Sequence, residues 1–240
     1  MKRKTLFIIT GLTTIVQAAL MVVCFGLLAQ IFGYPEIIRE KPGVILTELH
    51  ENASVVPYLY LGVAYSGGLV VFVAVLLKKV FEKETDAVWV DLGQISGVLS
   101  GFTFLFGLMR WLVLFPWLAD LYVNRQADPK TLELLFEAFN SYVGFSVAEH
   151  VGFLFLSLML IFFGLAILNS KLIPAWVGWL GLVIGLWVAY GNAEVFGLPF
   201  AFLVNRIAPE LSVVWCVIIG VYLVLAKDPA EKLTSQGVLP

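Results

Sequence analysis

The stretch GQISGVLSGFTFLFGLMRWLVLFPW, residues 93–117, decides the fold of this chain. A helix needs about 20 apolar residues to cross the ~30 Å hydrocarbon core of a bilayer, and this stretch is longer than that. It carries one charge, Arg110. A guanidinium at the centre of a membrane helix costs about 2.5–3.5 kcal/mol even on the insertion scale, so Arg110 should meet a polar partner or face a cavity.

The composition indicates that most of the chain lies in lipid. Of its 240 residues, 60% are hydrophobic and 13% are charged, and the mean hydropathy is +0.95. A soluble protein with such a surface would aggregate, so the lipid bilayer is the expected partner. The net charge of −2, without a basic cluster beyond Lys2, Arg3 and Lys4, argues against nucleic acid as a partner.

Six apolar segments predict an all-α, polytopic transmembrane helical bundle that forms a single integral membrane domain, residues 1–240. The predicted helices cover about residues 6–32, 57–81, 88–118, 135–168, 174–198 and 200–226. The last segment contains a polar interruption formed by Asn205, Arg206, Pro209 and Glu210. We therefore expect the membrane part of this helix to begin near Leu211.

The basic residues near the helix ends predict the orientation, because Lys and Arg concentrate on the cytoplasmic side of a membrane. The side that holds both termini carries Lys2, Arg3, Lys4, Lys78, Lys79, Lys83, Lys171, Lys227 and Lys232. The other side carries fewer, namely Arg39, Lys41, Arg125, Lys130 and Arg206. Both termini are therefore expected in the cytoplasm, with the chain in the plasma membrane as a multi-pass protein.

Two of the outer connections show helical signals. Between residues 34 and 56, Val44, Ile45 and Leu49 recur at helical spacing, and we expect a helix that lies on the membrane surface. Asp128 followed by Pro129 is typical of a helix start, with aspartate as the N-cap and proline at the first helical position. The fourth helix should therefore begin outside the membrane and run inward.

Small residues recur every third or fourth position on three of the predicted helices. Such positions let helix backbones approach closely, which is a main source of helix association in lipid. The residues are Gly93, Gly97 and Gly101, then Gly144, Ala148 and Gly152, then Gly178, Gly181 and Gly185. We expect them to pack within one bundle. Arg110 lies opposite the first of these stripes and should therefore face a different neighbour.

Further polar side chains are predicted at the depth of Arg110. The helices 88–118, 135–168 and 174–198 run outward, inward and outward in turn. Counting about 1.5 Å per residue from their outer ends places Arg110 in the outer half of the bilayer. The same count places there Glu149, His150, Asn192 and Glu194. Three helices agree on one depth, which predicts a polar pocket near the outer face.

Aromatic side chains are expected to form the walls of this pocket. At about 100° per residue, Tyr142 shares a helix face with Glu149, and Trp187 and Tyr190 share one with Glu194. Trp111 follows Arg110 directly. The candidate ligand-binding residues are therefore Arg110, Trp111, Tyr142, Glu149, His150, Trp187, Tyr190, Asn192 and Glu194.

These residues predict that the outer pocket binds a small amphipathic or anionic ligand. Arg110 would engage an acidic group, the two glutamates would balance the charge, and the aromatic walls would hold an apolar body. The identity of the ligand does not follow from the sequence.

Structural roles compete with this interpretation. Arg110 and Glu149 could form a buried ion pair that only fixes the register of two helices. His150 could be a hydrogen-bonded structural residue, and Glu194 could extend to the surface and meet Arg206. More acid–base groups surround Arg110 than helix register requires, and this excess favours a functional pocket.

Catalytic and cofactor signals are sparse. With His50 and His150 as its two histidines, the chain has no zinc site of known spacing, and it has no P-loop, Rossmann or G-x-S-x-G motif. A haem could bind between the two histidines, and the cofactor is otherwise left open. Glu149 or His150 could serve as acid or base in a membrane enzyme that acts on a lipid-soluble substrate. The same groups could relay protons in a proton-coupled transporter, or the chain could be a structural accessory subunit.

Three short motifs resemble a family of bacterial six-helix integral membrane proteins, the domain of unknown function 4386. They are GLMRW at residues 107–111 with Pro116, YVG at 142–144 leading to EHVG at 149–152, and SKLIPAWVGWLG at 170–181. The resemblance covers the third to the fifth predicted helix. It implies the six-helix topology and draws attention to Arg110 and Glu149, and it implies no activity or substrate.

Overall fold

The computed structural model describes residues 2–226, which are helical without any strand. Within this range six helical stretches are long and apolar enough to cross a membrane, which confirms the predicted all-α transmembrane bundle. They comprise α1 (Arg3–Ile31), α3 (Val56–Phe81), α4 with α5 (Ala87–Leu108, Leu114–Val123), α6 with α7 (Pro129–Phe139, Gly152–Leu168), α8 (Ala175–Asn192) and α9 (Ala201–Leu225). Lys227 and Lys232, two residues of the orientation argument, lie outside the described residues.

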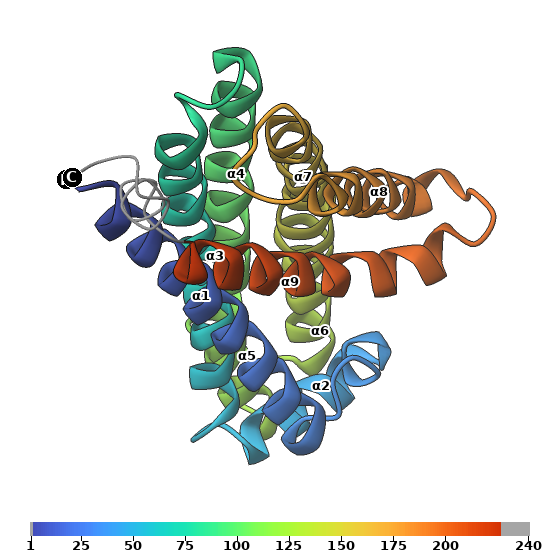
Figure 1. The fold of residues 1–240 in the computed structure, drawn as a ribbon. Coiled ribbons are helices and arrows are strands. Elements are labelled where there is room, and N and C mark those ends of the chain that lie inside the picture. Colours follow the sequence, from blue (N-terminus) through green and yellow to red (C-terminus); the bar gives the residue numbers. More distant parts are fainter. Residues whose placement is uncertain (1, 227–240) are drawn as a thin grey trace, which may run out of the picture.

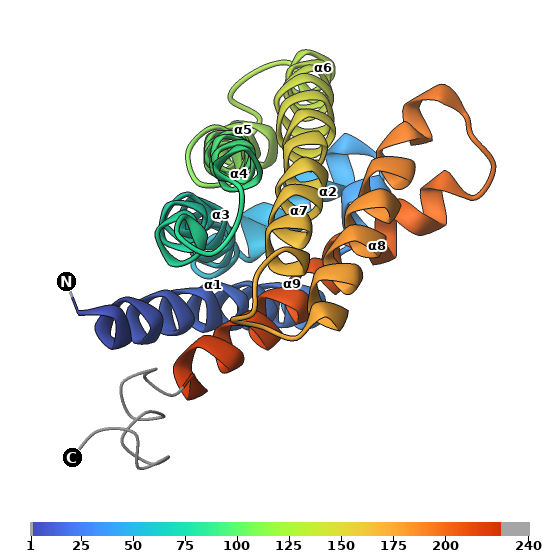
Figure 2. The same ribbon diagram turned by 45° about the horizontal axis from the view of Figure 1, so that its top comes forward.

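The six spanning helices form a closed ring. Each packs against its neighbours in the chain, and α1 packs against α9, so the order around the ring is α1, α3, α4, α7, α8, α9. Figure 2 shows this order, with α1 and α9 side by side. Successive helices run in opposite directions, so α1 begins and α9 ends at the same end of the ring.

Glycines make the closest contacts of the ring. A Cβ added to Gly11 of α1 would lie 2.6 Å from the carbonyl oxygen of Gly220 on α9, and one added to Gly220 would lie 2.9 Å from the carbonyl oxygen of Gly11. On α4, a Cβ at Gly101 would lie 2.8 Å from the carbonyl oxygen of Gly67 on α3. The packing role predicted for the glycines of the third spanning helix is confirmed, and the same kind of contact closes the ring.

Three shorter helices cover the end of the ring opposite the start of α1, here called the capped end (Figure 1). They are α2 (Pro42–Glu51), α5 and α6, which pack against one another. The third and fourth spanning stretches have 37 and 40 residues, and α5 and α6 form their ends. At about 1.5 Å per residue these stretches exceed the bilayer core by far, so α5 and α6 offer an apolar surface beyond it.

The helix predicted between residues 34 and 56 is present as α2, but two of its apolar residues do not lie on the membrane surface. Ile45 and Leu49 are fully buried in a core that they share with Phe115 of α5 and Phe136 of α6. Val44 alone of the predicted stripe is exposed. The projecting ends of α5 and α6 supply a protein surface that an isolated sequence segment does not reveal.

The third spanning helix is broken within the range predicted to be continuous, 88–118. After α4 ends, a 3₁₀ turn η2 covers Met109–Trp111, and α5 begins at Leu114. Pro116 explains the break because it has no N–H to donate to the carbonyl of Leu112 and its ring crowds that carbonyl. Arg110 therefore sits in a tight turn between two helices.

The fourth spanning helix begins as predicted and then changes type. The Asp128 carboxylate accepts hydrogen bonds from the N–H and the hydroxyl of Thr131, at 2.9 and 2.8 Å, and these bonds lower the pKa of Asp128. The helix thus starts with the predicted N-cap, outside the predicted range of 135–168. Between α6 and α7 it passes through a π-helical segment η3 (Asn140–Val151), in which residue i bonds residue i+5.

The last spanning helix is continuous through its polar residues. α9 contains Pro209 and still extends over 25 residues. The helix matches the predicted range 200–226, and the start of its membrane part near Leu211 stays a prediction. Asn205, Arg206 and Glu210 lie on this helix and line an internal cavity, where polar groups are tolerated at membrane depth.

Candidate functional site

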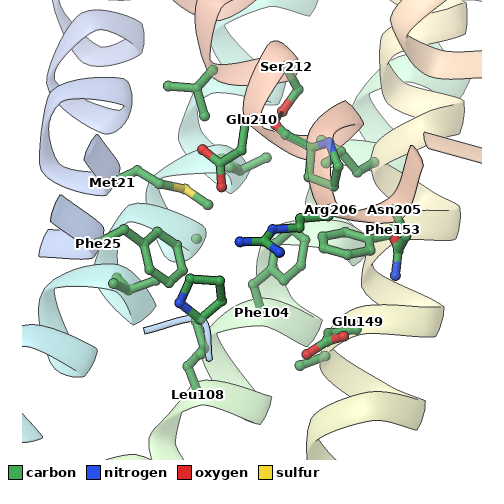
Figure 3. A pocket seen from close by; sticks show the side chains of 18 of the residues that line it. Met21, Phe25, Phe104, Leu108, Glu149, Phe153, Asn205, Arg206, Glu210 and Ser212 are labelled. Carbon is green, nitrogen blue, oxygen red and sulfur yellow. Dashed lines mark hydrogen bonds between the residues drawn. The ribbon is translucent and has the colours of Figure 1, made fainter. Parts of the chain in front are cut away.

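A cavity of about 360 Å³ lies inside the ring. Residues of α1, α3, α4, α7 and α9 line it, and the segment 34–39 between α1 and α2 contributes at the capped end. Figure 3 shows side chains that converge on this space, among them Met21, Phe104, Phe153 and Glu210. Small-molecule sites occupy about 300–1,000 Å³, so the cavity can hold a small ligand.

The two halves of the cavity differ in chemistry. Its deeper half, toward the middle of the ring, is apolar and lined by Val70, Val73, Leu156, Met159, Leu160 and Val213. A hydrogen-bonded pair on the same wall joins α1 to α3, in which Gln17 Nε2 donates to Ser66 Oγ at 3.1 Å. The half nearer the capped end carries Arg39, Arg110, Glu149, Glu194 and Arg206, and Glu210 lies between the two halves, three residues before Val213 on α9. The cavity is therefore amphipathic.

Arg110 is bound to the fourth spanning helix by an amide. Its Nε and Nη2 donate to Asn140 Oδ1 at 3.4 and 3.2 Å, and its Nη1 donates to the carbonyl oxygen of Gly107 at 2.6 Å. Within residues 2–226 Arg110 forms no ion pair with a carboxylate, so the expected pair with Glu149 is absent. Both residues nevertheless line the same cavity.

A glycine on the π-helical segment makes room for the guanidinium. A Cβ added to Gly144 would lie 2.5 Å from Arg110 Nη2 and 2.8 Å from Cζ. Any larger residue at this position would displace the arginine head group. Gly144 was predicted to allow close approach of a helix backbone. It does allow a close contact, but with the side chain of Arg110.

The π-helical segment explains which side chains of the fourth helix reach the cavity. Asn140, Phe145 and Glu149 line it, at intervals of five and four residues. Nine residues make about two and a half turns of an α-helix, so Asn140 and Glu149 would point in opposite directions there. The wider helix takes about two turns over the same distance and brings them to one face.

The remaining polar residues of the prediction fall into two groups. Glu194, in the 3₁₀ turn η4 (Ala193–Phe196), lines the cavity and accepts a hydrogen bond from Asn205 Nδ2 at 3.0 Å. It does not meet Arg206, which pairs with Glu36 at 2.7 Å. Asn192 and His150 lie outside the lining, and Asn192 Nδ2 donates to the carbonyl oxygen of His150 at 2.9 Å.

The aromatic walls differ from those predicted. Trp111 lines the cavity and stacks on Tyr60, with ring centroids 4.3 Å apart. Tyr142, Trp187 and Tyr190 are not part of the lining, and their exposed fractions are 70%, 50% and 42%. Tyr142 is turned away because the π-helical segment does not keep 100° per residue. Trp187 and Tyr190 lie on the exposed side of α8.

Four lining residues of importance escaped the prediction. Glu210 and Arg206 carried a visible signal as charges in an apolar segment, but they were interpreted as a polar interruption before the membrane part of the last helix. Asn140 reaches the cavity because it lies in the π-helical segment, and no periodic pattern in the sequence predicts that segment. Arg39 lies in the segment 34–39, whose place over the cavity depends on the closure of the ring.

The segment 34–39, which lines the cavity, is attached to α9. Glu36 pairs with Arg206, and the Arg39 guanidinium lies over the Phe202 ring at 4.2 Å. Tyr34 stacks on Phe25 of α1, with centroids 4.7 Å apart. Burial raises the pKa of Tyr34, and the carboxylates of Glu149 and Glu210 raise it further, so its hydroxyl remains a proton donor at this end.

The two histidines have different surroundings. His50 Nδ1 on α2 lies 3.9 Å from a carboxylate oxygen of Asp120 on α5, and the His150 ring lies 6.4 Å from that of Phe196. Neither lines the cavity. In the described part of the chain, no three His, Cys, Asp or Glu side chains gather as metal ligands would.

Ring, cavity and six apolar helices define a polytopic α-helical membrane protein with an internal amphipathic cavity. The chain belongs to the family described as domain of unknown function DUF4386, which it matches over residues 9–226. This match confirms the resemblance inferred from the three motifs. Comparison with curated proteins and with solved structures gave no match.

Proposed function

We propose that this protein binds a small amphipathic molecule in the cavity of the ring. The observation that carries the proposal is the division of the cavity into a charged half and an apolar half. A ligand with a polar end near Arg110 and Glu149 and an apolar body near Met159 and Val213 would match both halves. In this proposal Glu149 faces the ligand. His150 and Asn192 lie outside the lining and are joined to each other by a hydrogen bond.

Ordered apolar walls favour a bound molecule over an empty space. Trp111 and Tyr60 are each 2% exposed and stack on one another beside the cavity. Polar groups at membrane depth are costly unless they have partners or serve a site, and three arginines and three glutamates line this one cavity. A purely structural bundle would not require so many charges around a space that could be filled by apolar side chains.

The proposal can be tested with a matched pair of valines on α9. Val213 lines the cavity, whereas its neighbour Val214 is 53% exposed on the outside of the ring. Protein purified from membranes would be examined by native mass spectrometry, and small molecules extracted from it would be identified. We expect a bound amphiphile in the wild type and in Val214→Phe, and its loss in Val213→Phe. Equal occupancy in both variants, or none in the wild type, would refute the proposal.

We also infer that the chain lies in the plasma membrane with both termini in the cytoplasm. The Lys/Arg distribution supports this orientation, and the capped end would then face outward. A green fluorescent protein fused to the C-terminus should fluoresce in cells, and alkaline phosphatase fused there should be inactive. The opposite pair of results would reverse the orientation.

A further inference from the structure

The cationic side chains around the cavity are already engaged by the protein. Arg110 donates to Asn140 and to the Gly107 carbonyl, and Arg206 pairs with Glu36. Arg39 lies over the Phe202 ring. Each of the three arginines that line the cavity thus already contacts another residue of the protein.

Two carboxylates are in the opposite situation. Glu149 and Glu210 line the cavity from the fourth and the last spanning helix, and Figure 3 shows both carboxylates directed into the space. Across residues 2–226 neither forms a hydrogen bond or an ion pair. Glu149 is half-buried and Glu210 is exposed to the open space of the cavity, so both carboxylates are free to accept hydrogen bonds from a bound molecule.

The charge of the remaining lining residues also favours a positively charged ligand. Since Glu36 neutralises Arg206, the remaining lining charges are two arginines against three glutamates. Asn205, which also lines the cavity, has a buried Oδ1 without a hydrogen-bond partner in the described part of the chain. The unsatisfied groups around the cavity are therefore the acceptors of Glu149, Glu210 and Asn205 together with the Tyr60 hydroxyl, and the unbalanced charge is negative.

The apolar walls are suited to a positive charge as well. Phe25, Phe104, Phe145 and Phe153 line the cavity together with Trp111. The faces of aromatic rings carry partial negative charge and attract ammonium groups, more strongly where water is excluded. Carboxylates and aromatic faces together form the usual environment for a bound amine.

We propose that the polar end of the ligand is a protonated amine whose charge is balanced by the carboxylates of Glu149 and Glu210, with its apolar body directed toward Met159 and Val213. This inference rests on the proposed amphiphile site and assigns the charge of its ligand. It replaces the expectation from the sequence that Arg110 binds an acidic group. Arg110 instead holds the fourth helix in the register that presents Glu149.

The test uses three amphiphiles with the same ten-carbon chain: decylamine, decanoate and 1-decanol. Each would be offered below its micellar concentration to the full-length protein in detergent, and bound molecules would be counted by native mass spectrometry. We expect decylamine to bind most tightly. Glu149→Gln and Glu210→Gln should each weaken decylamine binding about tenfold or more, the effect of losing one charge-assisted hydrogen bond, and should leave 1-decanol binding nearly unchanged.

Two controls separate charge from folding. Glu137→Gln makes the same change on the exposed surface of α6 and should have no effect on any of the three ligands. Glu149→Asp keeps the charge and should retain most of the decylamine binding even where the glutamine variant is less stable.

The other outcomes are distinct. Preferred binding of decanoate that is lost in Arg110→Gln would overturn the assigned charge and leave the amphiphile site standing. Equal binding of all three molecules, unaffected by Glu149→Gln and Glu210→Gln, would overturn it too. Failure of all three to bind the wild type would reject the amphiphile site itself, and the inference with it.

Discussion

Arg110 Nε and Nη2 converge on one atom, Asn140 Oδ1, at 3.4 and 3.2 Å, and so join the third spanning helix to the fourth. The guanidinium also lies 5.6 Å from the Trp111 ring centroid and 5.7 Å from that of Phe115. Its direct partners are thus an amide, a carbonyl and two aromatic faces. Such partners hold the arginine in place without cancelling its charge.

The first prediction concerns Asn140. Replacing Asn140 with Ala removes the acceptor of two guanidinium N–H groups in a site where water is scarce. Leaving buried donors unsatisfied costs about 1–3 kcal/mol, and more for a charged group, so the free energy of unfolding should fall by at least about 1 kcal/mol. Thermal or denaturant unfolding of the purified protein, followed by circular dichroism, measures the change.

Asn124 is the matched control, since its Nδ2 donates to Asp120 at an exposed position. Asn124→Ala should leave the free energy of unfolding within about 0.5 kcal/mol of the wild type. Asn140→Asp should retain stability because a carboxylate accepts the same two bonds. If Asn140→Ala were as mild as Asn124→Ala, the two bonds would not hold the helices together.

The sequence alone predicts the membrane part of this fold because apolar length is a direct consequence of bilayer thickness. The six spanning segments, the Asp128 N-cap and the glycine contact of Gly101 with α3 all followed from local patterns. Depth was also informative, because Arg110, Glu149 and Glu194 do reach one cavity. Each of these predictions rested on a pattern or a residue count within a single segment.

The predictions failed where a helix departed from the regular α-helical period. Assuming 100° per residue placed Tyr142 beside Glu149 and left Asn140 on the opposite face, whereas the π-helical segment reverses both. Similarly, Glu210 was interpreted as part of a polar interruption outside the membrane, because a charge in an apolar segment is ambiguous until the cavity it faces is known. Such features depend on tertiary contacts, and the regular spacing of residues along one sequence does not reveal these contacts.

The second prediction concerns Gly144, which faces the Arg110 head group. In Gly144→Ala the new Cβ would lie 2.5 Å from Nη2, so the guanidinium must move away from Asn140. This displacement should destabilise the protein by about 1–3 kcal/mol, since overpacking and lost hydrogen bonds act together. Unfolding monitored by circular dichroism would report it.

Gly26 on α1 provides the comparison because an added Cβ there meets nothing within 4 Å. Gly26→Ala should be neutral or slightly stabilising, by up to about 1 kcal/mol, because alanine favours the helix more than glycine does. The prediction fails if the two alanine substitutions change stability in the same direction and by a similar amount.

The third prediction concerns the closure of the ring between α1 and α9. A Cβ at Gly11 would lie 2.6 Å from the carbonyl oxygen of Gly220, which belongs to the backbone and cannot swing aside. Gly11→Ala should therefore separate the two helices and lower the melting temperature clearly, unlike Gly26→Ala on the same helix. A cysteine pair placed across α1 and α9 near this contact should cross-link less completely in Gly11→Ala, and unchanged cross-linking would contradict the prediction.

The fourth prediction concerns access to the cavity through the segment 34–39. The Glu36–Arg206 pair ties this segment to α9 and is exposed, so it should contribute no more than about 0.2–1 kcal/mol. Glu36→Gln or Arg206→Gln should therefore raise the population in which the segment 34–39 is detached from α9 by up to about fivefold. The natural thiol of Cys216 lines the cavity and can report this opening.

The measurement is the rate at which a charged methanethiosulfonate, added from the side of the capped end, modifies Cys216 in a Cys24→Ser background. The rate should rise in either single variant and return toward that of the parent when the charges are exchanged by Glu36→Arg with Arg206→Glu. Added salt should raise the rate of the parent more than that of the single variants, because salt screens an exposed ion pair. If the single variants react at the rate of the parent, the segment 34–39 does not control the mouth, and molecules must reach the cavity between the helices from the lipid.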